Sequence, residues 1–362
     1  MAQSVARQLP TPPLFNPKNA GNWGYRPDQR AIFETAAAWK GQHGLKAARL
    51  DGQKVMLLLI DVQKDFCHPE GALYVGGRSG RGAIDDSARI AEFIYRNLNV
   101  VSDIATTLDT HFAYQIFSPS FVVDESGQPL KPFDVVLENC DIMRAGVCVG
   151  KASVSPAAAA VVANGDYATL QKQFEYYCKT LGQGGKYNLI MWPEHCLLGS
   201  EGHTLVGVIH EARLFHAYAR ASQSHCEIKG GSPYTENYSV LQPEVMTTFD
   251  GKALPGVQKN ARFIKMLLNY DRVIVAGQAG SHCVKSSIDD FLAEIVVQDP
   301  ALARKVYVLE DCMSAVTVPD GKGGFIADYT PDMDAALAKF GNAGMHVVKS
   351  TTPVSDWPGF LQ

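Results

Sequence analysis

Short apolar runs separated by amphipathic stretches fill most of the chain after about residue 50. Residues 55–60 are apolar throughout, whereas residues 84–98 repeat apolar positions at the spacing of a helix. Continuous apolar runs are typical of parallel strands that are covered on both faces. The pattern therefore predicts a doubly wound, three-layer α/β/α fold with a central, mostly parallel sheet. The predicted strands are 55–60, 103–108, 188–191, 226–228, 273–276, 306–309 and 346–348, and the predicted helices are 27–44, 84–98, 204–221, 259–268, 285–297 and 333–344.

Three parts of the chain depart from this alternation. Residues 1–53 form an N-terminal extension that begins with a Pro-, Asn- and Gly-rich lead, and residues 351–362 form a C-terminal tail. The main domain, 54–350, is interrupted at about 113–186 by turns, an alanine-rich patch and a polar helix. We expect this segment to be a large insertion, which would serve as a lid, as an oligomer contact or as a plain surface elaboration.

Composition narrows the class of protein. The 362 residues are 46% hydrophobic and 19% charged with a net charge of −4, which fits an ordinary soluble domain. No basic excess indicates binding to nucleic acid or to an anionic membrane, and no apolar run is long enough to span a bilayer. The first residues lack the apolar core of a signal peptide, and the eight cysteines lack paired C-x-x-C spacing. We therefore expect a cytoplasmic protein.

Cys283 lies where a predicted helix begins, after the buried strand 273–276 and a turn of small residues. The positive end of the helix dipole and the unpaired N–H groups of the first turn lower the pKa of a thiol there. This favours a thiolate nucleophile, although a small buried hydrophobe is the alternative reading of a single cysteine. The backbone amides of Ala279 and Cys283 would form an oxyanion hole.

Other reactive side chains also follow predicted strands. In open α/β sheets, ligands bind beyond the carboxyl ends of the strands. We expect Asp61 to take the thiol proton and pass it to a leaving amine, with Lys229 as the nearby cation, unless Lys229 is only a surface lysine. The reactive residues that follow strands are Asp61, Asp109, His111, His195, Lys229 and Cys283.

Asp109, His111 and His195 form a second group. One carboxylate and two imidazoles are ligands of catalytic divalent-metal sites, with zinc as the expected ion and iron or manganese as alternatives. A D-x-H triplet also occurs by chance, so these residues alone leave metal binding open.

Several longer stretches carry ordered motifs. Together they resemble the isochorismatase-like cysteine hydrolases, and nicotinamidases in particular, over about residues 54–112 and 186–350. The D-x-Q-x-D-F motif comes first in this order, and the nucleophile turn follows the I-K-G segment. The matching stretches are LLIDVQKDFC at 58–67, GALYVGG at 71–77, DTH at 109–111, WPEHC at 192–196, IKG at 228–230, GQAGSHCV at 277–284, VLEDC at 308–312 and AGMHVV at 343–348.

The resemblance implies specific roles for residues of this chain. Asp61, Lys229 and Cys283 would form a catalytic triad, and a divalent metal would bind Asp109, His111 and His195 and hold the pyridine nitrogen of the substrate. A non-proline cis peptide bond is expected at Gln278–Ala279. Candidate residues of the substrate pocket are Phe66, Gln278 and Tyr238, although Phe66 would alternatively pack beneath the pocket.

These features favour hydrolysis of nicotinamide, or of a similar heteroaromatic carboxamide, to the acid and ammonia, a step of pyridine nucleotide metabolism. A related cysteine amidohydrolase acting on an N-carbamoyl, ureido or aliphatic amide is the alternative, since such relatives need not hold a metal. A non-catalytic binding protein is a third hypothesis, which the complete triad opposes. The expected partner is a small-molecule amide, and the insertion and the resemblance suggest a homo-oligomer.

Overall fold

The computed structural model describes residues 7–184 and 187–361. The chain divides into two compact units, and each unit is built from separate segments of sequence. Unit 1 comprises the described residues up to 108, together with 204–227 and those from 261 onward. Unit 2 comprises the described residues of 109–203 and residues 228–260.

A six-stranded sheet in the order β14-β11-β10-β1-β2-β9 forms the centre of unit 1. β1 pairs in parallel with both β10 and β2, and the pairs β10–β11 and β11–β14 are also parallel. This confirms the predicted α/β class with a mostly parallel central sheet. The strands are β1 Val55–Ile60, β2 Asp103–Asp109, β9 His225–Lys229, β10 Arg272–Gly277, β11 Val306–Leu309 and β14 His346–Val348.

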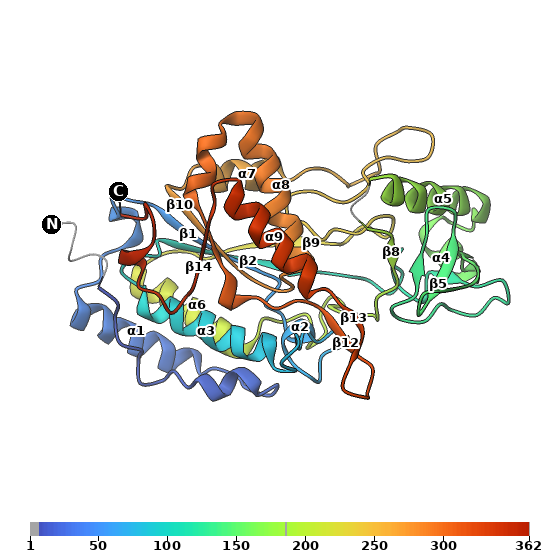
Figure 1. Ribbon diagram of the computed structural model, residues 1–362. Coiled ribbons are helices and arrows are strands. Elements are labelled where there is room, and N and C mark those ends of the chain that lie inside the picture. The colour runs from blue at the N-terminus through green and yellow to red at the C-terminus, as the bar shows by residue number, and fades with distance from the viewer. Residues whose placement is uncertain (1–6, 185–186, 362) are drawn as a thin grey trace. The chain divides into compact units, whose positions relative to one another are not determined.

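Helices cover both faces of this sheet (Figure 1). Helices α3 and α6 lie on one face, with α1 packed against α6, and α7, α8 and α9 lie on the other. A short β12–β13 hairpin also belongs to unit 1. The bounds are α1 Gln29–His43, α2 Lys64–Cys67, α3 Gly82–Arg96, α6 Gly207–Arg220, α7 Ala261–Leu268, α8 Cys283–Gln298, α9 Thr330–Asn342, β12 Thr317–Pro319 and β13 Phe325–Asp328.

Local sequence explains where the main elements begin and end. Every residue of β1 is buried, as expected for a strand covered on both faces. α1 begins after Asp28, whose carboxylate accepts hydrogen bonds from the Arg30 and Ala31 amides. It ends at Gly44, which has a φ of 61° in the left-handed region that glycine tolerates best.

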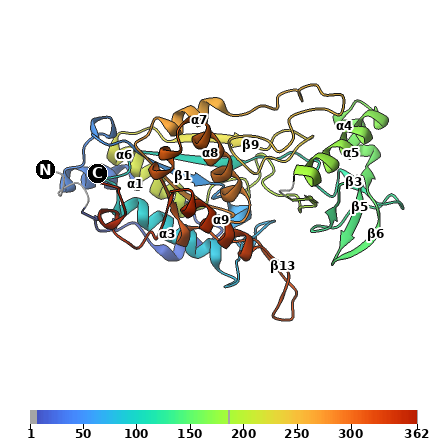
Figure 2. The ribbon, with the colours of Figure 1, turned by 45° about the horizontal axis from the view of Figure 1, so that its top comes forward.

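Unit 2 contains two small antiparallel sheets and two helices (Figure 2). One predicted strand, 188–191, is observed here as β8, and it pairs antiparallel with β4 instead of joining the parallel sheet. A short apolar run predicts a buried strand, but it carries no information about the partner strand. The bounds are β3 Val122–Val123, β4 Val135–Val136, β5 Asp141–Arg144, β6 Val147–Lys151, β7 Ser153–Val154, α4 Pro156–Val162, α5 Tyr167–Gly184 and β8 Leu189–Ile190.

Among the helices of residues 7–184 and 187–361, none combines the length and the apolar character that crossing a bilayer requires.

Candidate functional site

The order of the central sheet reverses between β1 and β10. The chain runs outward from β1 through β2 to β9, then returns to β10 beside β1 and continues to β11 and β14. Ile60 and Gly277, the last residues of β1 and β10, are paired in register. A side chain at Gly277 would collide with the Ile60 carbonyl, and the φ of Gly277 is +124°. Glycine therefore lets the two strand ends approach closely at the position where such folds bind ligands.

Asp61 follows β1 directly and is fully buried. Its φ of 44° lies in the left-handed region, which turns the chain sharply at the end of the strand. The hydroxyl of Thr107 on β2 accepts a hydrogen bond from the Asp61 amide at 2.9 Å and donates one to its Oδ1 at 2.5 Å. The side chain of Asp61 is therefore held in one orientation at the carboxyl end of the sheet.

Cys283 is the first residue of α8 and is 6% exposed. The turn before it is tight, because the Ala279 carbonyl accepts hydrogen bonds from the amides of both His282 and Val284. The Gln278–Ala279 peptide bond is cis, which confirms the prediction for this turn. A carboxylate oxygen of Asp61 and the Sγ atom of Cys283 lie within 4.8 Å of each other. Unit 1 therefore brings a buried thiol and a buried carboxylate together, as a nucleophile and its acid/base require.

His282, the neighbour of Cys283 in the chain, is occupied elsewhere. Its Nδ1 lies 2.8 Å from the Ser281 hydroxyl, and its ring packs edge-on against Tyr329. Burial, with a smaller contribution from Lys285, lowers the pKa of His282 to about 3. The imidazole is thus neutral and structural, so Asp61 is the better candidate for the acid/base.

Unit 2 gathers the predicted metal ligands. The Nε2 atoms of His111 and His195 lie 2.9 Å and 3.6 Å from Oδ2 of Asp109, and all three side chains are buried. The Nδ1 atom of His111 lies 3.1 Å from the Gly230 carbonyl, and that of His195 lies 2.7 Å from the Pro193 carbonyl. These carbonyls can accept a hydrogen bond from Nδ1, so in both rings it is the Nε2 atom that faces Asp109.

Charged neighbours keep Asp109 ionised. Burial alone would raise the pKa of its carboxyl, but His111 and Lys229 hold that pKa well below its usual range. The Nζ atom of Lys229 lies 2.9 Å from Oδ1 of Asp109 and donates a hydrogen bond to the Asn237 carbonyl. Lys229 is only 5% exposed, which contradicts the alternative of a surface lysine. The carboxylate is therefore a ready ligand for a cation.

Gly230 is a residue of this group that sequence reasoning missed as a functional position. Its φ is +86°, and a Cβ atom at this position would lie 2.6 Å from Cε1 of His111 and 2.7 Å from Oδ1 of Asp109. The I-K-G motif contained the signal, but only the packing shows why a side chain cannot be accommodated. The backbone of residue 230 forms one wall around the donor atoms.

The structure places the three candidate pocket residues in buried or half-buried positions. Phe66 is buried in α2, and the hydroxyl of Tyr238 accepts a hydrogen bond from the Trp192 indole at 2.6 Å. The Gln278 side chain is fully buried and bonded to Asp86 and to the Ser314 amide. Their contact with a substrate stays a prediction, as does the oxyanion hole formed by the amides of Ala279 and Cys283.

A buried carboxyl of unit 2 predicts a pH effect. Burial raises the pKa of Glu236 to about 8 from its ordinary 4.5, and Tyr177 donates a hydrogen bond to its Oε2. At a pH between these two pKa values, Glu236 keeps its proton in the folded protein but has lost it in the unfolded chain. The stability of the fold therefore falls as the pH rises from the lower value to the higher one. We expect the melting temperature of the wild type to fall more between about pH 5 and pH 8.5 than that of Glu236→Gln. Equal falls in both, with the exposed Glu125→Gln as control, would contradict this.

No model of a known protein family matches the chain, and no curated protein matches it. Solved structures with a similar fold include an Acinetobacter baumanii nicotinamidase/pyrazinamidase (17% identity, 83% of this chain and 98% of that one, TM-score 0.47). Another is a Pyrococcus horikoshii pyrazinamidase in complex with zinc (18% identity, 82% of this chain and 99% of that one, TM-score 0.42). A third is the yeast nicotinamidase bound to the inhibitor nicotinaldehyde (16% identity, 82% of this chain and 100% of that one, TM-score 0.46).

Proposed function

We propose that this protein is a cysteine amidohydrolase that converts nicotinamide, or a similar heteroaromatic carboxamide, to the acid and ammonia. The observation that carries the proposal is the pair formed by Asp61 and Cys283. Their side chains lie within 4.8 Å of each other at the reversal point of the sheet, and the thiol stands at the N-terminus of a 16-residue helix. The motif resemblance supports a carboxamide as the substrate.

The chemistry follows from these two groups. Sγ of Cys283 attacks the carboxamide carbon while Asp61 takes the thiol proton, and the same proton goes to the departing nitrogen, which leaves as ammonia. Water then attacks the thioester while Asp61 takes a proton from it; the C–S bond breaks, Asp61 returns this proton to Sγ, and the acid departs. Lys229 is assigned to the triad by the resemblance, as the cation that favours the charged forms.

The residues of unit 2 fit a divalent metal. Two imidazole nitrogens and one ionised carboxylate oxygen lie within 4.8 Å of one another, and Gly230 leaves room for no side chain beside them. This donor set suits zinc, and also iron or manganese. When bound, the ion would hold the ring nitrogen of a heteroaromatic amide. Asp109, His111 and His195 would hold the ion, and the Pro193 and Gly230 carbonyls would orient the two rings.

Replacing His195 by alanine is expected to lower the metal content of the purified protein and to raise KM for nicotinamide. The variant removes one nitrogen donor and leaves the oxygen donor and the other imidazole in place. Metal per chain, measured by mass spectrometry after dialysis, and KM check the expectation. His210→Ala on α6 is the control. Unchanged metal content in the His195 variant would show that the metal, if present, binds elsewhere.

Ammonia release from nicotinamide by the metal-loaded protein tests the proposed function. We expect turnover that a chelator abolishes and that added zinc, iron or manganese restores. Parallel assays with an N-carbamoyl amino acid and with an aliphatic amide separate the alternative substrates. Turnover of either alternative, without turnover of nicotinamide, would overturn the substrate assignment. Absence of hydrolysis with all three amides would overturn the amidohydrolase proposal.

A further inference from the structure

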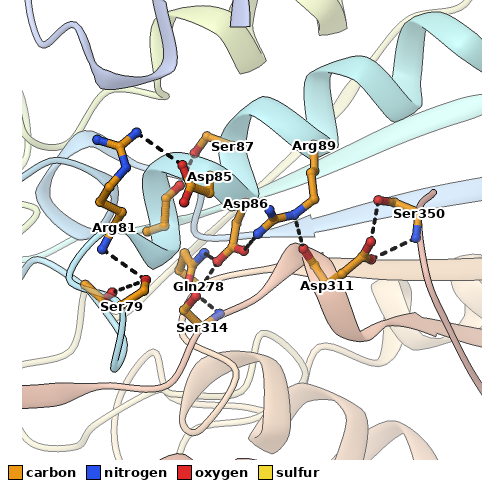
Figure 3. A network of polar contacts seen from close by, with 12 residues as sticks. Ser79, Arg81, Asp85, Asp86, Ser87, Arg89, Gln278, Asp311, Ser314 and Ser350 are labelled. Atoms are coloured by element: carbon orange, nitrogen blue, oxygen red, sulfur yellow. Dashed lines mark hydrogen bonds and ion pairs between the residues drawn. The ribbon is translucent and has the colours of Figure 1, made fainter. Parts of the chain in front are cut away.

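A buried aspartate on α3 contacts the turn that precedes Cys283 (Figure 3). Asp86 is 1% exposed, and its Oδ2 accepts a hydrogen bond from Nε2 of Gln278 at 2.8 Å and one from the Ser314 hydroxyl at 2.6 Å. Gln278 is the first residue after β10 and lies five positions before Cys283. The carboxylate thus binds the beginning of the nucleophile turn through a side chain.

The same turn is also bound from a second direction. The Ser314 amide donates a hydrogen bond to Oε1 of Gln278 at 3.2 Å, and the Ser314 carbonyl accepts one from the Gly280 amide at 2.8 Å. Ser314 therefore contacts the turn at two positions and Asp86 at one. Both polar atoms of the Gln278 amide are occupied, so its orientation is fixed.

Further donors fix the orientation of Asp86 itself. Arg89, one turn along α3, donates a hydrogen bond to Oδ1 of Asp86 at 2.7 Å and another to the Asp311 carbonyl at 2.5 Å. The Asp311 carboxylate in turn accepts hydrogen bonds from the amide and hydroxyl of Ser350. These contacts extend the network from the nucleophile turn across α3 to the segment after β14 (Figure 3).

Such a group is costly to bury. Burial raises the pKa of Asp86 in spite of its three hydrogen-bond donors. A well-packed apolar pair often stabilises a fold at least as well as a buried ionic group. A buried carboxylate whose bonds lead to a proposed catalytic turn is therefore better explained by the geometry that it imposes than by stability.

We propose that Asp86 is a positioning residue for the reaction: through the side chain of Gln278 it fixes the turn that presents the thiol of Cys283. The inference rests on the proposed function, and it extends the functional residues to a helix outside the sequence motifs. Because both polar atoms of the Gln278 side chain bond to Asp86 and Ser314, the network acts on the turn. We therefore expect it to affect the rate of the chemical step and to leave substrate binding nearly unchanged.

An exchange of the two partners tests this inference. Asp86→Asn leaves one acceptor oxygen in place of two, so the side chain can accept from Gln278 and Ser314 or from Arg89, but not from all three. Gln278→Glu places a second carboxylate opposite Asp86, so each single variant breaks part of the network. The double variant restores one amide and one carboxylate with their positions exchanged, and Ser314 and Arg89 keep a partner. We expect each single variant to lower kcat about 10- to 100-fold with KM changed less than about threefold. The double variant should return kcat to within about threefold of the wild type.

The matched control is Asp85→Asn, the same change one position earlier on α3. Asp85 is partly exposed and pairs with Arg81, so kcat should stay at the wild-type value. Single variants that behave like this control would overturn the inference. A double variant as slow as the slower single variant would also overturn it, because a purely structural role predicts accumulated damage and not recovery.

A second readout keeps this test independent of the amide substrate. The rate at which iodoacetamide alkylates Cys283, followed by peptide mass mapping over a range of pH, needs no hydrolysis. We expect both single variants to slow alkylation at neutral pH and to move the midpoint of its pH dependence to higher pH, because the thiolate loses its alignment with the amides of α8. The double variant should restore both the rate and the midpoint. Unchanged alkylation in both single variants would overturn the positioning role even if nicotinamide is not a substrate.

Discussion

Replacing Cys283 by alanine is expected to reduce amide hydrolysis by at least about 10⁴-fold, since loss of a covalent nucleophile removes the whole acyl-enzyme route. The thiol stands at the start of α8 with the Asp61 carboxylate within 4.8 Å. Alanine favours helices and is smaller than cysteine, so the helix and its packing should persist. Initial rates of ammonia release, measured at substrate concentrations well above and well below KM, check the expectation.

The control for this variant is Cys178→Ala, which removes another buried thiol from a helix, α5 of unit 2. It should keep wild-type turnover. Circular dichroism spectra and melting temperatures of both variants show whether either change disturbs the fold. Turnover of the Cys283 variant near that of the wild type, with its fold intact, would remove Cys283 from the role of nucleophile and leave Asp61 without the partner that we assign to it.

Replacing Gly230 by alanine is expected to weaken metal binding by about 10- to 100-fold or more, the usual effect of disturbing groups that orient metal ligands. A Cβ atom here would lie 2.6 Å from His111 and 2.7 Å from Asp109, distances that only displacement of these side chains can relieve. The φ of +86° adds backbone strain for any residue other than glycine. Metal per chain after dialysis against a graded chelator series measures the loss, and hydrolysis should fall with it.

The adjacent glycine supplies the matched control for this variant. A Cβ atom on Gly231 would meet only the Phe112 ring, at an ordinary contact distance of 3.8 Å. Gly231→Ala should therefore bind metal and turn over substrate like the wild type. If both alanine variants keep full metal affinity, the close contacts at Gly230 do not control the donor set. If both lose it equally, the effect comes from the backbone of this loop in general.

Much of unit 1 follows from the sequence because some of its strands, β1 and β11 above all, are apolar throughout. β1, β11 and β14 have the predicted bounds, and α8 begins only two residues before the predicted helix, at Cys283 itself. The small sheets of unit 2 were not predicted. β3, β4 and β7 have two residues each, too few to show any periodicity, and their pairing depends on contacts between distant parts of the chain.

The residues of the candidate site could be predicted from the sequence only in part, for a similar physical reason. Residues that follow a predicted strand could be assigned from local pattern alone, as Asp61 and Lys229 were. Asp86 could not, because an aspartate in an amphipathic helix normally faces solvent, and its partner Gln278 lies 192 positions away in the chain. Gly230 was noticed as part of a motif, but its steric role depends on the side chains of Asp109 and His111 and is visible only once the chain is folded.

The division of unit 2 into two segments has a consequence for protein synthesis. Asp109, His111 and His195 lie in the first segment, whereas Lys229 and Gly230 lie in the second, with 119 positions between His111 and Gly230. The growing chain leaves the ribosome from its N-terminus, so the ligands emerge before the cation that balances Asp109 and before the carbonyl that orients His111. A nascent chain that ends before β9 therefore carries every proposed metal ligand and the Pro193 carbonyl, but it lacks Lys229 and the Gly230 carbonyl. The surroundings of the donor set become complete only when the second segment has been made.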